Sequence, residues 1–177
     1  MNLELRIVDE SGAAVEPGQI GEIQVRGPVV MSGYWRNPTA TADAVRDGWF
    51  RTGDAARIDA DGFVFIVDRF KDMYISGGEN VYPNEVENVI SACPGVLHVA
   101  VIGVADEKWG EVGCAYVVVR DGHGLTQEII RAHCLVHLAK YKIPKRFVFV
   151  SELPRTASGK VMKGELRNLY LKTSEAK

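Results

Sequence analysis

The stretch from residue 68 to residue 83 constrains the fold more than any other part of this sequence. It joins a charged corner at residues 68–72 to the pair Gly77-Gly78, and this turn leads to Pro83, which suits the first turn of a helix. Such an order fits a pivot between two domains better than the middle of one domain. We therefore divide the sequence near residue 70.

The part before this division is predicted to be β-rich. Apolar and polar residues alternate in its first strands, and turn-forming residues separate the segments. A short helix is expected from Asn37 to about Val45, and residues 59–62 are typical of a hairpin turn. The strands expected in this part cover residues 3–8, 20–26, 56–58 and 63–67.

The part after the division is predicted to mix helices and strands as a small α+β domain, with helices packed on a short sheet. Helical spacing of apolar residues indicates one buried stripe after Pro83 and another in the closing helix. The first stripe consists of Val86, Val89, Ile90 and Cys93, and the second of Met162, Leu166, Leu169 and Tyr170. A further helix is expected over residues 126–138, and strands over residues 96–104, 112–119 and 147–150.

Composition narrows the class of protein. The chain has 177 residues, of which 46% are hydrophobic and 25% charged, as in an average soluble globular protein. Its net charge of -2 leaves no basic footprint for a nucleic acid. No apolar run reaches the roughly 18 residues of a membrane helix, so no membrane span is expected. The first residues also lack the basic lead and long apolar core of a signal peptide.

The cysteines and histidines are expected to be structural. Cys93, Cys114 and Cys134 stand far apart and form no CxxC pair, which favours small buried thiols in a reduced, cytoplasmic setting. His133 and His137 have a helical i, i+4 spacing that can bind a metal ion. No third ligand with convincing spacing follows them, so we favour the structural interpretation and expect no metal site.

Three segments in this order resemble one enzyme superfamily. They are Trp-Phe-Arg-Thr-Gly-Asp at residues 49–54, the pivot stretch at residues 68–83, and Pro-Arg-Thr-Ala-Ser-Gly-Lys at residues 154–160. Together they are similar to the adenylate-forming enzymes, which include acyl-CoA synthetases, aryl-CoA ligases, luciferases and the adenylation domains of peptide synthetases. The resemblance implies that residues 1–70 form the β-rich end of the large N-terminal AMP-binding domain. Residues 71–177 then form the mobile C-terminal domain.

The resemblance also implies roles for four residues in nucleotide binding, in adenylation and at the hinge. Asp54 matches the aspartate that holds both ribose hydroxyls of ATP, and Arg69 matches an arginine that contacts the nucleotide. Lys71 falls on the hinge position. Lys160 matches the catalytic lysine that bridges the substrate carboxylate and the α-phosphate, where its charge lowers the repulsion between two anions.

Other residues are candidates for binding CoA in the second half-reaction. Gly77 and Gly78 let the backbone lie against the pantetheine arm, where a Cβ would clash. Trp109 sits where related synthetases place an aromatic residue near the CoA nucleotide, and Lys145 and Arg146 are candidates for the CoA phosphates. Each has a plainer alternative: the glycines form only a turn, Trp109 caps an apolar patch, and the basic pair is a solvated edge.

Two elements of the superfamily do not occur in this sequence. They are the phosphate loop ending in Pro-Lys-Gly and the Tyr-Gly-x-Thr-Glu segment, which hold the ATP phosphates, Mg²⁺ and most of the acyl pocket. We therefore expect a C-terminal fragment whose partner is the missing N-terminal AMP-binding domain. The fragment alone is expected to be inactive and to bind no cofactor, with Mg²⁺ held through the missing domain.

The sequence favours a fatty-acid–CoA ligase as the parent enzyme. Its pivot stretch resembles the version found in fatty-acyl-CoA and aryl-CoA synthetases, and no carrier-protein segment follows Lys160. Such an enzyme activates a fatty acid with ATP to acyl-AMP and transfers the acyl group to CoA. The alternatives are an aryl-CoA ligase fragment and a non-catalytic module that binds CoA or a protein partner. The oligomeric state stays open.

Overall fold

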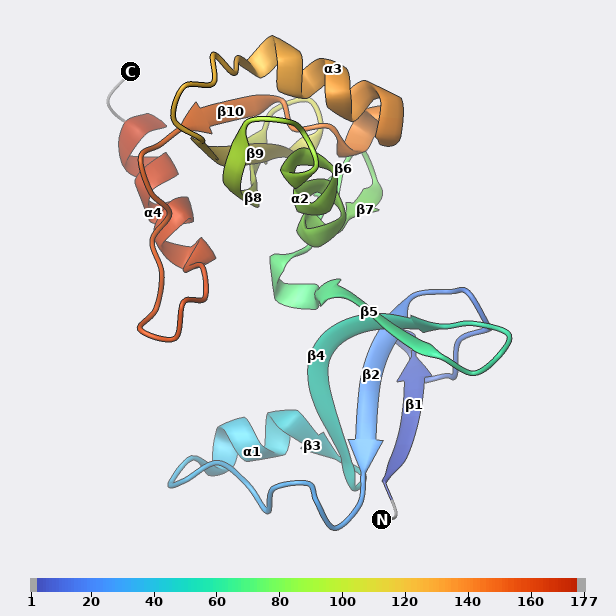
Figure 1. The fold of residues 1–177 in the computed structure, drawn as a ribbon. Coiled ribbons are helices and arrows are strands. Elements are labelled where there is room, and N and C mark those ends of the chain that lie inside the picture. The colour runs from blue at the N-terminus through green and yellow to red at the C-terminus, as the bar shows by residue number, and fades with distance from the viewer. Residues whose placement is uncertain (1–2, 175–177) are drawn as a thin grey trace. The chain divides into compact units, whose positions relative to one another are not determined.

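A computed structural model describes residues 3–174 of the chain, with two compact units, Met1–Lys71 and Asp72–Lys177 (Figure 1). Each unit has its own β-sheet, and helices and strands are mixed along the chain, so the fold class is α+β. Met1, Asn2 and residues 175–177 lie outside the described residues, as does the prediction about the first residues of the chain.

The first unit is an antiparallel sheet with one short helix. The strands follow the order β1-β2-β4-β3, and β5 also pairs with β4. The elements are β1 (Glu4–Val8), β2 (Gly21–Arg26), α1 (Pro38–Ala44), β3 (Val45–Arg46), β4 (Trp49–Ile58) and β5 (Val64–Arg69). The predicted strands and helix are confirmed, but β4 begins earlier than predicted and bends strongly (Figure 1).

Local hydrogen bonds explain where these elements begin. The side chain of Asn37 accepts a hydrogen bond from the amide of Ala40 and so caps α1, while Pro38 occupies the first turn. In the β4–β5 hairpin, the carboxylate of Asp59 accepts from the amides of Asp61 and Phe63 at 3.0 and 2.9 Å. Turn residues that bond to their own backbone are the usual reason for a tight reversal at such a point.

The second unit is a mixed sheet covered by three helices. The strand order is β10-β9-β6-β7, with β8 also paired to β9; β10 runs parallel to β9 and the other pairs are antiparallel. The elements are η1 (Phe70–Asp72), which spans the division, and then β6 (Tyr74–Ser76), β7 (Glu79–Val81), α2 (Pro83–Ser91), β8 (Val96–Asp106), β9 (Gly110–Val119), α3 (Gln127–His137), η2 (Lys140–Lys142), β10 (Arg146–Phe149) and α4 (Lys163–Ser174).

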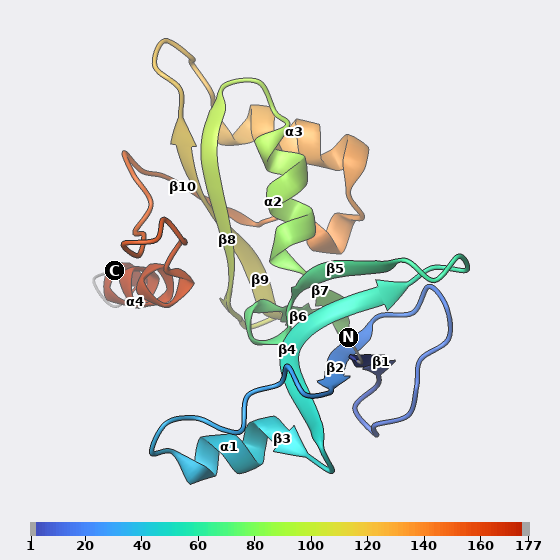
Figure 2. The ribbon, with the colours of Figure 1, turned by 60° about the horizontal axis from the view of Figure 1, so that its bottom comes forward.

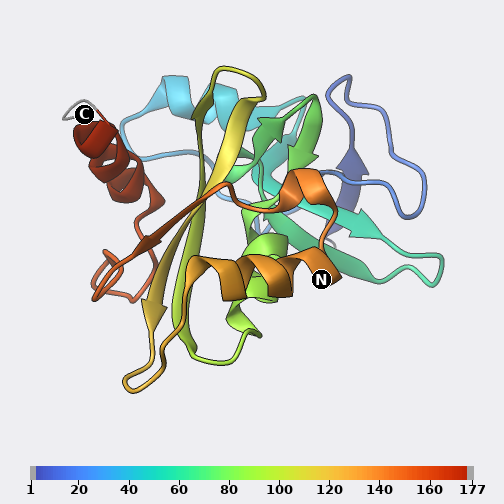
Figure 3. The ribbon, with the colours of Figure 1, turned by 90° about the horizontal axis from the view of Figure 1, so that it is seen from above.

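Strand β9 belongs to two apolar cores at once, because successive side chains of a strand point to opposite faces. Ala115 and Val117 join the core beneath α2 and α3, which lie on one face of the sheet (Figures 2 and 3). Cys114 and Tyr116 join the core on the other face, where α4 contributes Leu166. Both strands of the β8–β9 hairpin are therefore apolar on both sides.

Helices α2 and α3 follow the predicted pattern, whereas in α4 the predicted stripe is buried at Leu166 but exposed at Leu169. Pro83 stands in the first turn of α2, and the stripe after it is buried or half-buried. The hydroxyl of Thr126 caps α3 by accepting from the amide of Ile129. All three cysteines are buried and free, as predicted. No helix within residues 3–174 is long and apolar enough to cross a membrane.

Histidines 133 and 137 lie on α3, with ring centroids 4.8 Å apart. A ring nitrogen of His133 lies 3.1 Å from the carbonyl oxygen of Val89 on α2, which ties the two helices together. Over the described part of the chain, no cluster of three or more His, Cys, Asp or Glu side chains could hold a metal ion.

Candidate functional site

A wide bulge interrupts β4 at the segment that carries Asp54. Gln24 of β2 pairs with Arg51, and Glu22 pairs with Ala55. Between these two pairs, β2 contributes a single residue and β4 contributes residues 52–54. A bulge bends its strand and re-aims a side chain, and bulges are common beside active sites.

Side chains hold this bulge in place. The carboxylate of Glu22 accepts from the amide of Gly53 at 3.2 Å and from Nε of Arg51 at 2.9 Å. The hydroxyl of Thr52 donates a hydrogen bond to the carbonyl of Ile23 and accepts one from the amide of Asp54. Gly53 has a φ of +72°, a conformation that favours glycine.

Asp54, the last residue of the bulge, lies opposite Arg69, its register partner on β5. The Nε atom of Arg69 lies 2.9 Å from Oδ1 of Asp54. The Asp54 side chain is 26% exposed and that of Arg69 is 55% exposed, so a ligand can reach both. The structure thus brings together the two residues that were predicted to bind the nucleotide.

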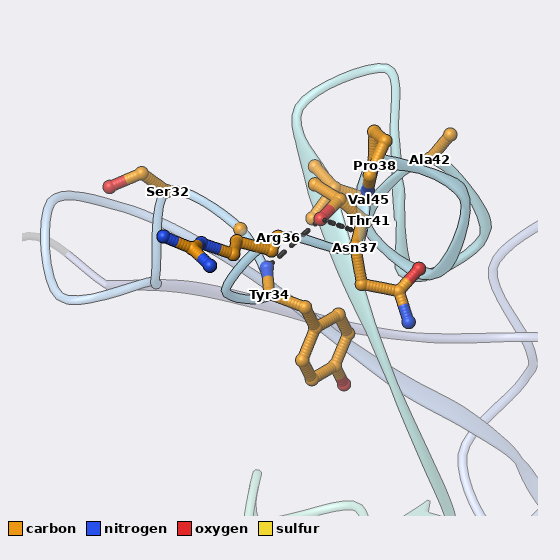
Figure 4. Close-up of a pocket in the computed structure, with 9 residues that line it drawn as sticks. Ser32, Tyr34, Arg36, Asn37, Pro38, Thr41, Ala42 and Val45 are labelled. Carbon is orange, nitrogen blue, oxygen red and sulfur yellow. Dashed lines mark hydrogen bonds between the residues drawn. The ribbon is translucent and has the colours of Figure 1, made fainter.

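Among the described residues of the first unit, two of the hollows lie near α1, and neither is lined by Asp54 or Arg69. The larger one lies between the loop at residues 32–37 and α1 (Figure 4). There the hydroxyl of Thr41 accepts from the amide of Tyr34 and donates to the carbonyl of Asn37, which fixes the loop to the helix. The smaller hollow is lined in part by Glu22 and residues 51–53, so it borders the bulge.

In the second unit, Lys160 lies at the end of a turn that supports itself. The amide of Thr156 donates to the carbonyl of Lys160 at 2.8 Å, and the amide of Lys160 donates to the Thr156 hydroxyl at 3.1 Å. Arg155 adds a hydrogen bond to the carbonyl of Gly159. Lys160 is exposed and forms no ion pair with any residue that the structure describes.

Ion pairs anchor the helix that follows this turn. Lys163 of α4 lies 2.8 Å from the carboxylate of Glu87 on α2, and Glu87 also accepts from the amide of Val101 at 2.8 Å. Arg167 of α4 lies 3.4 Å from Asp72, the first residue of the second unit. These contacts tie α4 to the residue next to the predicted hinge, Lys71.

Gly77 and Gly78 form the turn between β6 and β7, with φ values of +63° and +87°. A Cβ built on Gly77 would stand 2.7 Å from ring atom Cε3 of Trp109, whereas a Cβ on Gly78 would meet nothing within 4 Å. The amide of Gly77 also donates to the carbonyl of Trp109 at 2.9 Å. The indole therefore occupies the space that Gly77 leaves open.

A cavity of about 380 Å³ lies next to this indole, lined by Ser76, Trp109, Val112, Lys140, Tyr141, Ile143 and Lys145. The Nζ atom of Lys145 lies 4.5 Å from the Trp109 ring centroid, a cation–π contact. The next residue, Arg146, instead lies over the ring of Tyr170 on α4, 5.4 Å from its centroid. The structure thus gathers Gly77, Trp109 and Lys145, and directs Arg146 elsewhere.

Behind this region, Tyr74 is packed against glycines. A Cβ on Gly103 would stand 2.3 Å from the Cβ of Tyr74, and one on Gly113 would stand 2.5 Å from its hydroxyl. That hydroxyl is buried without a hydrogen-bond partner among the described residues. Burial, and then the negative charge of Glu111, raises the pKa of Tyr74 well above its usual value.

Sequence reasoning missed several residues that shape these surfaces. Glu22 alternates with apolar neighbours in β2, so its position predicted only a solvated strand face. Lys140 and Tyr141 follow the end of α3 and carried no motif of their own. The Lys-rich composition of that loop was the one signal that could have drawn attention to them.

Comparison with known proteins gives these surfaces a context. Residues 85–160 match the family model described as AMP-binding enzyme C-terminal domain. The chain is 52% identical over 167 residues to a feruloyl-CoA synthase of Amycolatopsis sp, covering 94% of this chain and 34% of that protein. It is 45% identical over 173 residues to the long-chain-fatty-acid–CoA ligase FadD13 of Mycobacterium tuberculosis, covering 98% of this chain and 34% of that protein.

A solved structure agrees with these relatives. ATP-bound MatB from Rhodopseudomonas palustris superposes with a TM-score of 0.89 at 44% identity, over 95% of this chain and 34% of that one. The chain therefore spans about a third of the length of each protein that it matches. Residues 85–160 therefore match the C-terminal domain family of AMP-binding enzymes, and the chain over most of its length is similar to the C-terminal part of adenylate-forming enzymes.

Proposed function

We propose that the chain is the C-terminal part of an AMP-forming acid–CoA ligase. Such an enzyme joins a carboxylic acid to AMP at the expense of ATP and then transfers the acyl group to the thiol of CoA. The observation that carries the proposal is the bulge in β4, which turns an accessible Asp54 toward Arg69. A strand that only had to complete the sheet would not need this interruption.

Asp54 and Arg69 are proposed to bind the nucleotide. A carboxylate can accept hydrogen bonds from both hydroxyls of a ribose, as acidic residues do in dinucleotide sites. The planar guanidinium of Arg69 suits ribose or phosphate oxygens and, at 2.9 Å from Asp54, also holds the carboxylate in one orientation. These two residues belong, in this proposal, to the β-rich end of an AMP-binding domain.

Lys160 and Lys71 are proposed to act in the two steps of the reaction. The exposed ammonium of Lys160 would neutralise charge where the acid carboxylate meets the α-phosphate, and its self-supported turn limits the entropy lost in placing it. Lys71 lies at the division between the compact units, where a small change of backbone angles reorients everything that follows. The second unit is proposed to be the mobile C-terminal domain.

The surface around Trp109 is proposed to receive CoA. Gly77, Gly78 and Lys145 lie at or beside this indole, and a cavity opens there. Lys145 offers a cation for a phosphate, while the indole offers an apolar face. Arg146 is retained as a weaker candidate, because its guanidinium lies over Tyr170 and not beside Trp109.

Two classes of carboxylic acid are proposed as the substrate. A fatty acid is favoured because one relative is named a long-chain-fatty-acid–CoA ligase, while the pivot stretch fits both fatty-acyl-CoA and aryl-CoA synthetases. An aromatic acid is favoured by the greater identity to the feruloyl-CoA synthase, 52% against 45%. ATP and CoA are the proposed co-substrates. A reduced, cytoplasmic setting suits the three buried free cysteines.

Two hybrid enzymes test the proposal. In one, this chain replaces the corresponding C-terminal part of the feruloyl-CoA synthase; in the other, it replaces that of FadD13. We expect ATP-dependent acyl-AMP formation and CoA thioester formation in at least one hybrid, and the better partner indicates the acid class. A pair of folded hybrids that bind acid and ATP yet form neither product would refute the ligase assignment. CoA binding without chemistry would instead favour a non-catalytic CoA-binding module.

A further inference from the structure

We propose that Glu22 is a positioning residue that sets the direction of the Asp54 carboxylate by clamping the bulge between them. This inference rests on the nucleotide-binding role proposed for Asp54. It goes further in naming a residue that would touch neither the nucleotide nor the acid. Four groups of contacts around the bulge support it.

The first contact is with the bulge itself. Residues 52–54 face a single residue of β2, so the backbone groups within the bulge lose their regular ladder partners. The amide of Gly53 is satisfied instead by Oε1 of Glu22, at 3.2 Å. Gly53 immediately precedes Asp54. Glu22 therefore holds the backbone next to the residue whose carboxylate is to be oriented.

The second contact fixes the carboxylate of Glu22. Its Oε2 lies 2.9 Å from Nε of Arg51, and it also accepts from Nε2 of Gln24 at 3.3 Å. The Glu22 side chain is only 13% exposed, whereas that of Arg51 is 43% exposed. A carboxylate so shielded from water needs such partners, and they leave it little freedom to move.

The network extends further, to Arg6 and Trp49. The side-chain oxygen of Gln24, which is itself buried, accepts from Arg6 at 2.7 Å. The guanidinium of Arg6 in turn lies over the ring of Trp49, 4.1 Å from its centroid. Glu22 is therefore held by neighbours on β1, β2 and β4, all within one sheet.

The fourth contact carries the constraint to Asp54. The hydroxyl of Thr52 accepts from the amide of Asp54 at 3.0 Å and donates to the carbonyl of Ile23 at 2.9 Å. With the amides of Gly53 and Asp54 both anchored, the side chain of Asp54 leaves the bulge toward Arg69. Without the Glu22 carboxylate, the Gly53 amide loses its acceptor, while the hydrogen bond from the Asp54 amide to Thr52 remains.

The test measures ribose recognition by an active hybrid enzyme with two probes, AMP and 2′,3′-dideoxy-AMP, which lacks the hydroxyls. Calorimetric titration gives both dissociation constants, and their ratio reports the diol contact alone. We expect Glu22→Ala to weaken AMP binding by about tenfold to a hundredfold, the usual effect of losing an orienting partner. The dideoxy probe should bind unchanged, so the ratio falls toward one.

Matched variants separate positioning from stability. Arg51→Met removes the ion pair but leaves the Glu22 acceptor for Gly53, so it should keep most of the discrimination between the probes. Glu22→Gln keeps an acceptor for the Gly53 amide and should also keep most of the discrimination, and a complete loss in this variant would contradict the clamp. Glu10→Gln removes an exposed carboxylate elsewhere and should change nothing. Preserved discrimination in Glu22→Ala, or an equal loss in Arg51→Met, would overturn the inference.

Hydrogen exchange distinguishes failure of this inference from failure of the proposed function. If an active hybrid with the unaltered chain does not discriminate between the probes, the ribose role of Asp54 is wrong. In that case the hydrogen-exchange rate of the Gly53 amide still tests whether Glu22 clamps the bulge. Faster exchange at Gly53 in Glu22→Ala, with β1 amides unchanged, supports the clamp, and unchanged exchange at Gly53 overturns it.

Discussion

The indole of Trp109 lies across the backbone of Gly77, so close that a Cβ on Gly77 would stand 2.7 Å from the ring. The sequence predicted that both glycines of the turn leave room for a ligand. At Gly77 that room is already filled by Trp109, and only Gly78 faces open space. The two glycines therefore serve different purposes, one in packing and one in access.

Alanine at each position should separate these purposes. Both glycines have positive φ, so each substitution carries a similar backbone cost. Gly77→Ala must also displace the indole, and we expect it to lower the free energy of unfolding by about 1–3 kcal/mol more than Gly78→Ala. Urea unfolding measures both losses, and Trp109 fluorescence reports the displaced ring. Equal losses in the two variants would contradict the packing role of Gly77.

Asp54→Asn should damage nucleotide binding more than stability. A hydrogen bond to a charged group contributes about 1.5–3 kcal/mol, so loss of the ribose contacts should raise the KM for ATP of an active hybrid at least about tenfold. The Asp54–Arg69 pair is accessible to water, and such pairs contribute only about 0–1 kcal/mol to folding. Kinetics and urea unfolding test the two effects separately. A large loss of stability with an unchanged KM would make Asp54 structural.

Lys160→Ala should slow adenylation far more than thioester formation. Removal of one group that stabilises developing charge typically costs about 10²–10³ in rate. The hybrid ligase can be assayed for acyl-AMP formation and, separately, for CoA transfer from preformed acyl-AMP. Lys172→Ala removes an exposed lysine from α4 and is the matched control. Equal losses in both half-reactions would refute the assigned role.

Lys71→Pro should hold the second unit in one orientation. Proline fixes φ and removes an amide, so the backbone change proposed for the hinge becomes inaccessible. We expect one half-reaction of the hybrid to survive and the other to be lost. Lys71→Ala keeps the backbone free and should retain both. If both rates are unchanged in Lys71→Pro, the hinge lies elsewhere.

The buried thiols should make the second unit less stable in alkali. Burial raises the pKa of Cys114 and of Cys134 from 9.0 to about 11, so the unfolded chain loses these protons first. The stabilisation is complete below pH 9 and is lost as the pH rises toward 11. Urea unfolding across this range should show the decline, with a smaller slope in Cys134→Ala. Rapid alkylation of the native chain at neutral pH would contradict the burial of the thiols.

Locally encoded features of the fold were predictable from the sequence. The hydroxyl of Thr126 caps α3 where the helix was expected to begin, because capping depends on residues within one turn. The strand at β10 was also predicted, but its parallel pairing with β9 depends on residues far away in sequence. Leu169 was expected beside Leu166 in the buried stripe of α4. That was wrong, since Leu169 is 49% exposed and only Leu166 faces the core fully.

The candidate site was predictable as motifs but not as geometry. The segment ending at Asp54 was recognisable, yet the bulge that aims it depends on a register offset that alternation conceals. Glu22 was missed because a glutamate between apolar residues of a strand indicates a solvent-exposed face. Its hydrogen bonds with Arg51 and Gln24 can be seen only in the three-dimensional structure. The different directions of the Lys145 and Arg146 side chains could have been predicted, because neighbouring residues at the start of a strand point to opposite faces.

Strand β9 connects two surfaces of the second unit, because its side chains lie in both cores. Its side chains supply both the core that flanks the Gly77 turn, through Tyr74 and Val81, and the core that flanks the Lys160 turn, through Leu153 and Val161. A backbone shift in β9 therefore reaches both turns at once. The surface proposed for thiol transfer and the surface proposed for acid activation rest on one shared strand.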